Sequence, residues 1–538
     1  MKRAAFGGLF LAALAAAFYF RLTDLALRPM HHDEANQAVK FGTLLEEREY
    51  IYDKNDHHGP ALYFLTLPAA KAMGRQRFVD VDEALLRTVP ALFGGAILLL
   101  LLLFGRGLAT EARALAALLI AVSPAMTYYS RFYIQEMCFV FFVLGFLGSL
   151  WRYVLRTDGG WYVVAGVFAG LMAATKETAV IVFVTAALGL AAALVREKIV
   201  APKKDVPVQR RIFLRHIVIM AVIAAAVAAA FFSSFGANPG GIKDAVSAFK
   251  IYVEKGSVAP GLHAHPFFYY LGTLAGSNSR GLVWTELLVL LLGLAGMFFI
   301  IRPHRRSEYE ENVDPLPVDR SLGLFFVVYT IGTTLVYSFL KYKTPWNMLP
   351  FYLGWLILAG IGGVAVFRAM KTVLLRAVVL LVIAAGLGHL AWQSHLADFR
   401  YPADPLNPYV YSQTSPDFLK LVGRINDLAA VHPDGKSLLI KILAGPYEQW
   451  PLPWYLRKYK KVGYWDKAEA AGELAAADLI VAAAEQAETV RKKLGEGYIV
   501  EHYGLRPEVL LTLFIPPNIW DEFIKSRDHP PPSPLPGR

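Results

Sequence analysis

Titratable side chains are concentrated between positions 30 and 60 of this chain. Met30–Pro60 contains the acidic pair Asp33–Glu34 and four histidines, at positions 31, 32, 57 and 58. A carboxylate can act as a general base toward a hydroxyl or an amine, and imidazole and carboxylate groups can bind a divalent metal. We therefore expect acid–base chemistry at Asp33 and Glu34. If a divalent metal takes part, Glu34, His57 and His58 are its candidate ligands.

A second group of polar side chains follows at the ends of apolar runs. Its candidate substrate-binding members are His58, Arg87, Arg131, Glu136, Lys176, His263, His265, Lys341 and Lys343. Charges at membrane depth cost roughly 2.5–3.5 kcal/mol each on insertion scales, so several on one side of a membrane indicate a site. Arginine and lysine can hold a phosphate and stabilise it as it leaves. Together with a carboxylate base, the set suits transfer of a group from a lipid-linked phosphate donor to an acceptor.

The composition indicates a polytopic α-helical membrane protein. Of its 538 residues, 56% are hydrophobic, and the mean hydropathy is +0.41. Apolar runs of about 17–22 residues recur, which is the length that spans the hydrocarbon core. The net charge of +11 comes from basic residues at the ends of these runs, so membrane orientation explains it better than nucleic-acid binding. The single cysteine, Cys138, excludes a disulfide within the chain and a site of several cysteines.

Eleven apolar segments are long enough to be predicted as spanning helices. They lie at roughly 4–20, 84–104, 111–128, 133–154, 159–175, 177–196, 213–232, 282–302, 322–340, 347–366 and 373–393. Residues 59–73 are shorter and interrupted by proline, which favours a helix at the membrane interface. The first run could be a cleavable signal peptide, but the bulky residues Phe18, Tyr19 and Phe20 stand where a cleavage site needs small ones. We interpret it as an uncleaved first helix.

The positions of the basic residues predict the orientation. Arginines and lysines alternate between rich and poor ends of successive spans, which by the positive-inside rule places the N-terminus in the cytoplasm and the C-terminus outside. The candidate site residues then fall on the outer face of the cytoplasmic membrane. Three regions are expected: a transmembrane domain (1–396) whose first outer loop (21–83) carries the acid pair, a small extracytoplasmic α/β domain (397–520), and a disordered proline-rich tail (521–538).

The α/β expectation rests on strands that alternate with helices. Apolar runs predict strands at 437–443, 461–465, 478–483 and 509–515, and helical patterns lie at 416–430, 449–459 and 485–494.

Each candidate also has a simpler structural interpretation. Asp33–Glu34 could cap a helix that begins near Ala35, because acidic groups favour helix N-termini. His58–Gly59–Pro60 could be a turn before a helix. Arg131, between tyrosines, could reach lipid headgroups, as could Lys341 and Lys343. The His263–Ala264–His265 segment could be an ordinary loop, since two histidines without a third ligand are a weak metal signal.

Several motifs resemble a known superfamily. The acid pair, an interfacial segment and an arginine entering the second span (LLRTVPALFG) resemble the protein O-mannosyltransferase-like GT-C glycosyltransferases of glycosyltransferase family 39. The pair Asp33–Glu34, the HGP triplet at 58–60, Arg87 and Arg131 more closely resemble a prokaryotic branch labelled flippase-activity-associated membrane proteins. The motifs KTPWNMLP and LPWYLR also look like that branch.

The resemblance implies an inverting sugar transfer from a polyprenyl-phosphate-linked donor. It assigns the role of general base to Asp33, and it implies that Glu34 orients Asp33 or the acceptor. By their charge, Arg131, Lys341 and Lys343 are candidates for the donor phosphate. Arg87 is a candidate to hold the loop acids, and His58 to contact phosphate, metal or acceptor. Some relatives use a divalent metal and others do not.

The sequence thus predicts a membrane glycosyltransferase whose acceptor is a glycan, a lipid or a protein. Two other interpretations stay open. One is a lipid-linked glycan flippase or transport component, which usually has repeated halves and charged residues at mid-membrane, and neither is evident here. The other is a lipid-binding scaffold that keeps the fold without catalysis.

Overall fold

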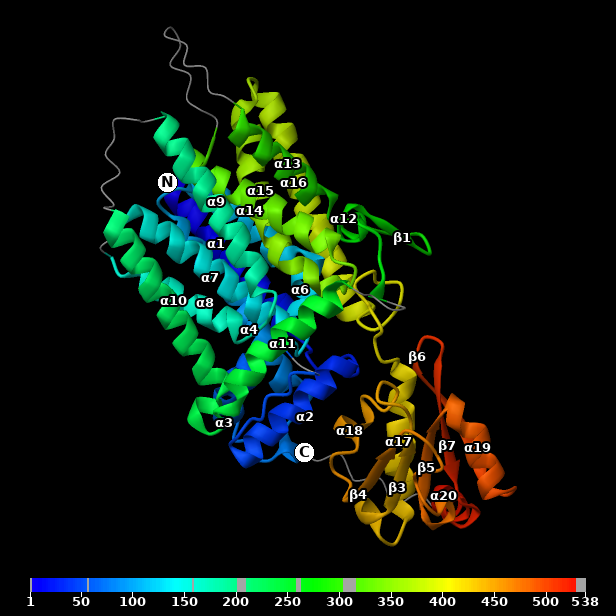
Figure 1. Ribbon diagram of the computed structural model, residues 1–538. Coiled ribbons are helices and arrows are strands. Elements are labelled where there is room, and N and C mark those ends of the chain that lie inside the picture. The colour runs from blue at the N-terminus through cyan, green and yellow to red at the C-terminus, as the bar shows by residue number, and fades with distance from the viewer. Residues whose placement is uncertain are drawn as a thin grey trace. The chain divides into compact units, whose positions relative to one another are not determined.

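The computed structural model (Figure 1) describes residues 2–55, 58–156, 159–200, 210–257, 263–302 and 316–528. The chain divides into two compact units. The first comprises Met1–Leu25, Glu47–Met73 and Ala84–Tyr411. The second comprises Ala26–Glu46, Gly74–Glu83 and Ser412–Arg538. The loop that carries the acid pair therefore belongs to the same unit as the C-terminal part of the chain.

The first unit is helical apart from one short hairpin, as far as the described residues show. Its helices are α1 (Lys2–Leu22), α3 (Ala61–Ala72), α4 (Glu83–Leu100), α5 (Thr110–Val122), α6 (Pro124–Ser130), α7 (Glu136–Leu155), α8 (Trp161–Ala173), α9 (Ala179–Val200), α10 (Arg210–Phe232), α11 (Gly240–Ser257), α12 (Tyr269–Ala275), α13 (Leu287–Ile301), α14 (Arg320–Phe339), α15 (Leu349–Ala369) and α16 (Val373–His395). The hairpin pairs β1 (Ser277–Ser279) with β2 (Leu282–Trp284).

Each of the eleven predicted spans falls on described helices, which confirms a polytopic helical membrane protein. Among the described residues, seven helices are long and apolar enough to cross a membrane, and the pair α5 and α6, bent by 58°, makes up to eight. The remaining three predicted spans correspond to shorter apolar helices: Phe6–Leu22, Trp161–Ala173 and Leu287–Ile301.

Glycines allow close packing between α13 and α15. A Cβ on Gly296 would lie 2.3 Å from the Leu358 carbonyl oxygen, and one on Gly362 would lie 1.8 Å from that of Leu292. Both distances are far below van der Waals contact, so only glycine fits. Small residues at helix contacts let backbones approach where both helices are apolar all round.

The second unit contains a five-stranded sheet in the order β4-β3-β5-β7-β6. Its strands are β3 (Leu439–Leu443), β4 (Lys461–Trp465), β5 (Leu479–Ala483), β6 (Ile499–Arg506) and β7 (Val509–Ile515). β3 pairs in parallel with β4 and β5, whereas β7 pairs antiparallel with β5 and β6. Successive side chains of a strand face opposite sides of the sheet, so both faces of these apolar strands need cover.

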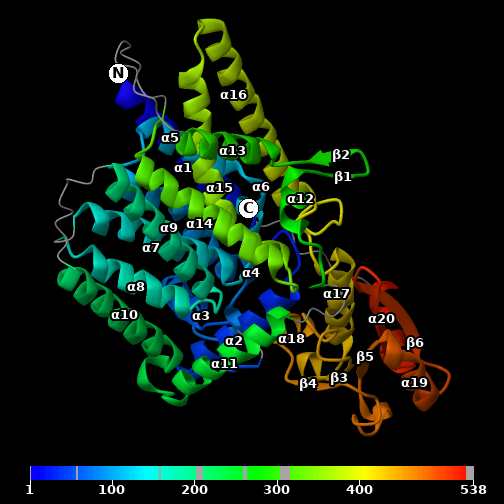
Figure 2. The same cartoon turned by 45° about the horizontal axis from the view of Figure 1, so that its top comes forward.

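Helices supply that cover on both faces (Figures 1 and 2). One face packs against α17 (Pro416–Val431) and α20 (Pro517–Asp528), and the other packs against α19 (Ala484–Leu494). The α17 sequence explains its position. Ser415 caps the helix by accepting from the Asp417 backbone N–H, and Phe418, Leu421 and Ile425 recur at helical spacing and are fully buried.

The structure differs from three local expectations. β6 was not predicted, because its sequence (IVEHYGLR) does not show a regular alternation of apolar and polar residues. The predicted helix at 449–459 contains only α18 (Leu452–Tyr455). Residues 521–528, expected to belong to a disordered tail, continue α20, because Ile519 and Phe523 pack into the core. Residues 529–538 lie outside the described residues.

Candidate functional site

The acid pair opens helix α2 (His32–Glu47), and its two carboxylates lie in different environments. Glu34 is fully buried. It forms a two-point ion pair with Arg28, with Nη1–Oε2 and Nη2–Oε1 distances of 2.6 and 3.0 Å. Its Oε2 also accepts from the His31 backbone N–H at 2.9 Å. The simpler interpretation therefore holds for Glu34, whose carboxylate caps the start of α2 and is neutralised by Arg28.

Asp33 remains accessible, with 32% of its side chain exposed. Its Oδ1 lies 2.9 Å from His32 Nε2, and its Oδ2 lies 3.6 Å from His31 Nδ1. Burial lowers the pKa of His31 to about 4, against the opposing effect of the Asp33 carboxylate. His31 is consequently neutral near pH 7. An accessible carboxylate between two imidazoles can accept a proton.

The same three residues form the cluster most suited to a metal among the described residues. One ligand atom from each of His31, His32 and Asp33 lies within 4.8 Å of the others. Neutral imidazole and carboxylate are donors that zinc and similar ions accept. This set differs from the expected one: Glu34 is committed to Arg28, His58 belongs to another cluster, and His57 lies outside the described residues.

The HGP triplet packs against the turn between α8 and α9. The Gly59 N–H donates to the Thr175 carbonyl at 3.1 Å, and a Cβ on Gly59 would lie 2.1 Å from the Ala174 carbonyl oxygen. Next to it, His58 Nδ1 lies 2.8 Å from the carboxylate of Glu177. The triplet thus forms the turn before α3, with Pro60 at its N-cap, and it brings His58 to a carboxylate.

A buried ion pair lies on the same α8–α9 turn. Lys176 Nζ is 2.6 Å from Glu136 Oε1 and 2.7 Å from Asn347 Oδ1. Both charged side chains are at most 5% exposed. Lys176 thereby joins the start of α7 to the turn at Pro345–Met348 that precedes α15. Two members of the predicted set, Lys176 and Glu136, thus lie in contact.

Arg87 and Arg131 are buried and bind backbone carbonyls. Arg131 donates to the carbonyls of Phe20, Thr23 and Asp24 at 2.5–2.9 Å and is 5% exposed. The interpretation of Arg131 as a headgroup anchor is therefore wrong. Arg87, fully buried, donates to the Leu25 carbonyl at 2.7 Å. Both arginines hold the chain that leaves α1, and the expected contact of Arg87 with the loop acids stays a prediction.

His263, His265 and Lys343 meet although about 80 residues separate them. The Lys343 N–H donates to the His263 carbonyl at 3.0 Å, and Lys343 Nζ donates to the His265 carbonyl at 3.2 Å. The His263 ring stacks on Tyr342, and His263 Nδ1 lies 2.8 Å from the Tyr411 hydroxyl. Burial lowers the pKa of Lys343, and burial beside Lys343 lowers that of His265. Lys341 is exposed.

Sequence reasoning missed a buried carboxylate, Glu286, at the start of α13. It accepts from Ser123 Oγ at 2.6 Å, from the Ala125 N–H at 3.0 Å and from the Tyr409 hydroxyl at 2.7 Å, and also from the Tyr352 hydroxyl. These contacts fix the break at Ser123 between α5 and α6. Helix α6 ends seven residues later, at Ser130, next to Arg131. An acid inside the apolar run WTELLVLL was the available signal.

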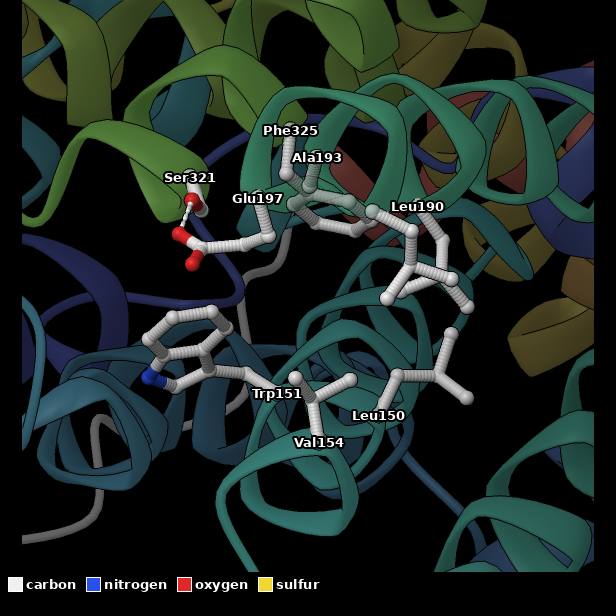
Figure 3. Close-up of a pocket in the computed structure, with 9 residues that line it drawn as sticks. Leu150, Trp151, Val154, Leu190, Ala193, Glu197, Ser321 and Phe325 are labelled. Carbon is white, nitrogen blue, oxygen red and sulfur yellow. Dashed lines mark hydrogen bonds between the residues drawn. The ribbon is translucent and has the colours of Figure 1, made fainter. Parts of the chain in front are cut away.

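The pocket in Figure 3 lies apart from these residues. Helices α7, α9 and α14 border it, and most of its lining is apolar. At one edge the Ser321 hydroxyl donates to the Glu197 carboxylate. None of the predicted site residues lines it. In the predicted topology these helix ends face the cytoplasm.

Known proteins share this fold. ArnT from Cupriavidus metallidurans, bound to undecaprenyl phosphate, superposes with a TM-score of 0.59 at 13% identity, over 94% of this chain and 98% of its own. The oligosaccharyltransferase AglB from Archaeoglobus fulgidus, in complex with an inhibitory peptide and dolichol phosphate, gives 0.57 at 14% identity, over 93% and 70%. The arabinofuranosyltransferase AftD from Mycobacteria gives 0.50 at 13%, over 96% and 40%.

Sequence comparison adds a family match to part of the chain. The dolichyl-phosphate-mannose-protein mannosyltransferase family matches residues 76–230, which include Arg87, Arg131, Glu136 and Lys176. None of the curated proteins matches the sequence. Assignment to the flippase-activity-associated branch stays a prediction. The chain is thus a multi-pass membrane protein with the fold of the GT-C glycosyltransferases, and its residues 76–230 match the dolichyl-phosphate-mannose-protein mannosyltransferase family.

Proposed function

We propose that this protein transfers a sugar from a polyprenyl-phosphate-linked donor to an acceptor at the outer face of the cytoplasmic membrane, with Asp33 as general base. The observation that carries the proposal is the contrast within the acid pair. Glu34 is buried and neutralised by Arg28, whereas Asp33 is accessible beside two imidazoles. The relatives support the donor class, since ArnT is bound to undecaprenyl phosphate and AglB to dolichol phosphate.

In this proposal Asp33 accepts the proton of an acceptor hydroxyl or amine as that atom attacks the anomeric carbon. The bond between the anomeric carbon and the phosphate oxygen breaks, and the polyprenyl phosphate leaves with the bonding electrons. Attack opposite the leaving group inverts the anomeric centre. Glu34 and Arg28 hold the start of α2, so that the Asp33 carboxylate stays in one orientation.

A cation is needed at the departing phosphate. Among the three candidates, Arg131 and Lys343 already donate to backbone carbonyls, whereas Lys341 is exposed. We therefore favour Lys341 as the phosphate ligand, with Lys343 beside it. His58, held by Glu177, is a proposed contact for the acceptor or the phosphate.

If the protein uses a divalent metal, we propose that His31, His32 and Asp33 hold it. Such an ion would supply Lewis-acid stabilisation of the phosphate charge. Elemental analysis of purified protein, wild type beside His32→Ala, tests this. Loss of bound metal in the variant supports the site. A metal-free wild type whose activity survives exhaustive chelation removes it.

Transfer of label from a panel of polyprenyl-phosphate sugars to host membrane extract tests the function. General bases contribute about 10²–10⁴-fold, so Asp33→Asn should lower transfer by at least 10²-fold while donor binding persists. Asp82→Asn is the matched control, because Asp82 is an acid of the same unit whose side chain is 45% exposed. If the wild-type protein binds the polyprenyl-phosphate sugar but transfers no label, the result would instead favour a flippase component or a lipid-binding scaffold.

The proposed orientation places the N-terminus in the cytoplasm and the second unit outside. The support is the distribution of basic residues along the chain. A C-terminal tag should then be cut by protease added to intact spheroplasts, and protection of that tag would contradict the orientation.

A further inference from the structure

We infer that the C-terminal part of the second unit positions the acid-pair loop, and that Gln413 and Tyr455 are positioning residues for Asp33. The catalytic consequence of this inference rests on the proposed function. Its structural part concerns only how firmly residues 28–36 are held in one conformation. This can be measured by amide hydrogen exchange without an activity assay.

Two side chains from the C-terminal part bind the backbone just before α2. Gln413 Nε2 donates to the Pro29 carbonyl at 2.9 Å, and the Met30 N–H donates to the Tyr455 hydroxyl at 3.0 Å. Gln413 is 2% exposed and Met30 is fully buried. Hydrogen bonds shielded from water hold more firmly than exposed ones. The Gln413 bond is buried and the Tyr455 bond is partly buried, and together they hold the peptide between Pro29 and Met30.

The core of the unit positions the Tyr455 anchor. The Tyr455 ring packs edge-on against Phe418, with 5.5 Å between ring centroids, and Phe418 is fully buried in the core beneath the sheet. Only two residues, His31 and His32, separate Met30 from Asp33. On the other side of Asp33, Glu34 is tied to Arg28. Asp33 therefore lies within a short segment that is held at both ends.

Trp454 in α18 and Arg457, two residues after the end of α18, also hold the other N-terminal segment of this unit. Trp454 Nε1 donates to the Glu83 carboxylate at 2.8 Å, and Arg457 donates to the Val81 carbonyl at 2.6 Å. The residues on either side of Tyr455 thus bind residues 81–83, while Tyr455 binds Met30. Residues 454–457 of the C-terminal part therefore contact both N-terminal segments.

Positioning of this kind affects the rate through geometry. A base must lie within hydrogen-bond reach of the proton that it removes, and a displacement of about 1 Å can cost 10²-fold. Loss of an anchor should therefore lower kcat. The donor KM should stay nearly unchanged, because the donor phosphate is proposed to bind Lys341 and Lys343 and not the anchor residues.

The test compares Tyr455→Phe with Tyr459→Phe. The Tyr459 hydroxyl likewise forms a hydrogen bond within this unit, which it donates to Asn426 Oδ1 at 2.8 Å, but it has no part in the acid-pair anchor. Amide hydrogen exchange of residues 30–36 should accelerate in Y455F and stay at the wild-type rate in Y459F. From the loss of one hydrogen bond, kcat should fall about threefold to tenfold in Y455F.

A second variant, Gln413→Leu combined with Tyr455→Phe, should lower kcat further, by about 10- to 100-fold. Its donor KM should stay within about twofold of wild type. Exchange and kcat in Y455F equal to those in Y459F would overturn the inference, as would faster exchange with unchanged kcat in an active enzyme. If wild-type protein transfers no sugar, the proposed function fails, and the exchange comparison alone decides whether these residues order the loop.

Discussion

Substitution of Arg28 by methionine tests whether the acid pair is held as the structure indicates. Arg28 and Glu34 are 5% and 0% exposed and meet through two hydrogen bonds of 2.6 and 3.0 Å. Removal of one partner of a buried pair leaves an uncompensated charge and costs about 3–5 kcal/mol. At about 1.4 kcal/mol per tenfold, the opening equilibrium of α2 should rise by about two to almost four orders of magnitude.

Amide hydrogen exchange along α2 under native conditions measures this opening directly. Arg77→Met is the matched control. Arg77 forms the same two-point geometry with Asp80, at 2.9 and 3.0 Å, but its side chain is 70% exposed. Because water screens that pair, R77M should leave the exchange of α2 unchanged.

The double variant R28M/E34Q separates the effect of an unpaired buried charge from the effect of changed side-chain shape. In R28M/E34Q no buried charge remains, and the amide oxygen of glutamine can still accept from the His31 N–H. Part of the lost protection should therefore return. Equal exchange in R28M and R77M would refute the reasoning, because it would mean that the Glu34 carboxylate does not depend on Arg28.

Two further predictions concern packing and pH. Gly59→Ala should lower the unfolding temperature in detergent, because its Cβ would lie 2.1 Å from the Ala174 carbonyl oxygen and overpacking costs about 1–3 kcal/mol. The control Gly272→Ala should not lower it, because no atom lies within 4 Å of the added Cβ. Equal unfolding temperatures of the two variants would contradict the predicted clash. The start of α2 should loosen as pH falls from about 6.5 toward 4, because the pKa of buried His31 is lowered to about 4 and the opened loop binds a proton that the closed loop excludes. Exchange rates corrected for intrinsic pH dependence should show this in wild type and not in H31Q, and a pH-independent opening of wild type would contradict it.

Local sequence patterns were sufficient for most of the fold. Apolar runs of spanning length located the membrane helices, and short apolar runs located β3, β4, β5 and β7. The length of an apolar run depends only on residues that are adjacent in the sequence, so it can be recognised without the fold. β6 escaped prediction because half of its residues are polar or glycine, so its pairing with β7 decides its conformation rather than its own composition.

The candidate site was predictable in residue type and only partly in arrangement. The sequence singled out Asp33 and Glu34, but their different environments depend on Arg28, whose burial no local pattern reports. Lys176 and Glu136 were expected on one face, and they form an ion pair. Glu286 was missed because four donors from distant parts of the chain surround it.

The second unit is built from segments that a ribosome makes far apart in time. Residues 26–46 and 74–83 emerge more than 300 residues before Ser412, which at 5–20 residues per second is a delay on the order of twenty seconds to a minute. Until then Pro29 and Met30 lack the side chains of Gln413 and Tyr455 that bind them. The acid-pair loop is therefore completed only after Tyr455 has been made, and a chain that terminates before this residue never acquires a finished loop.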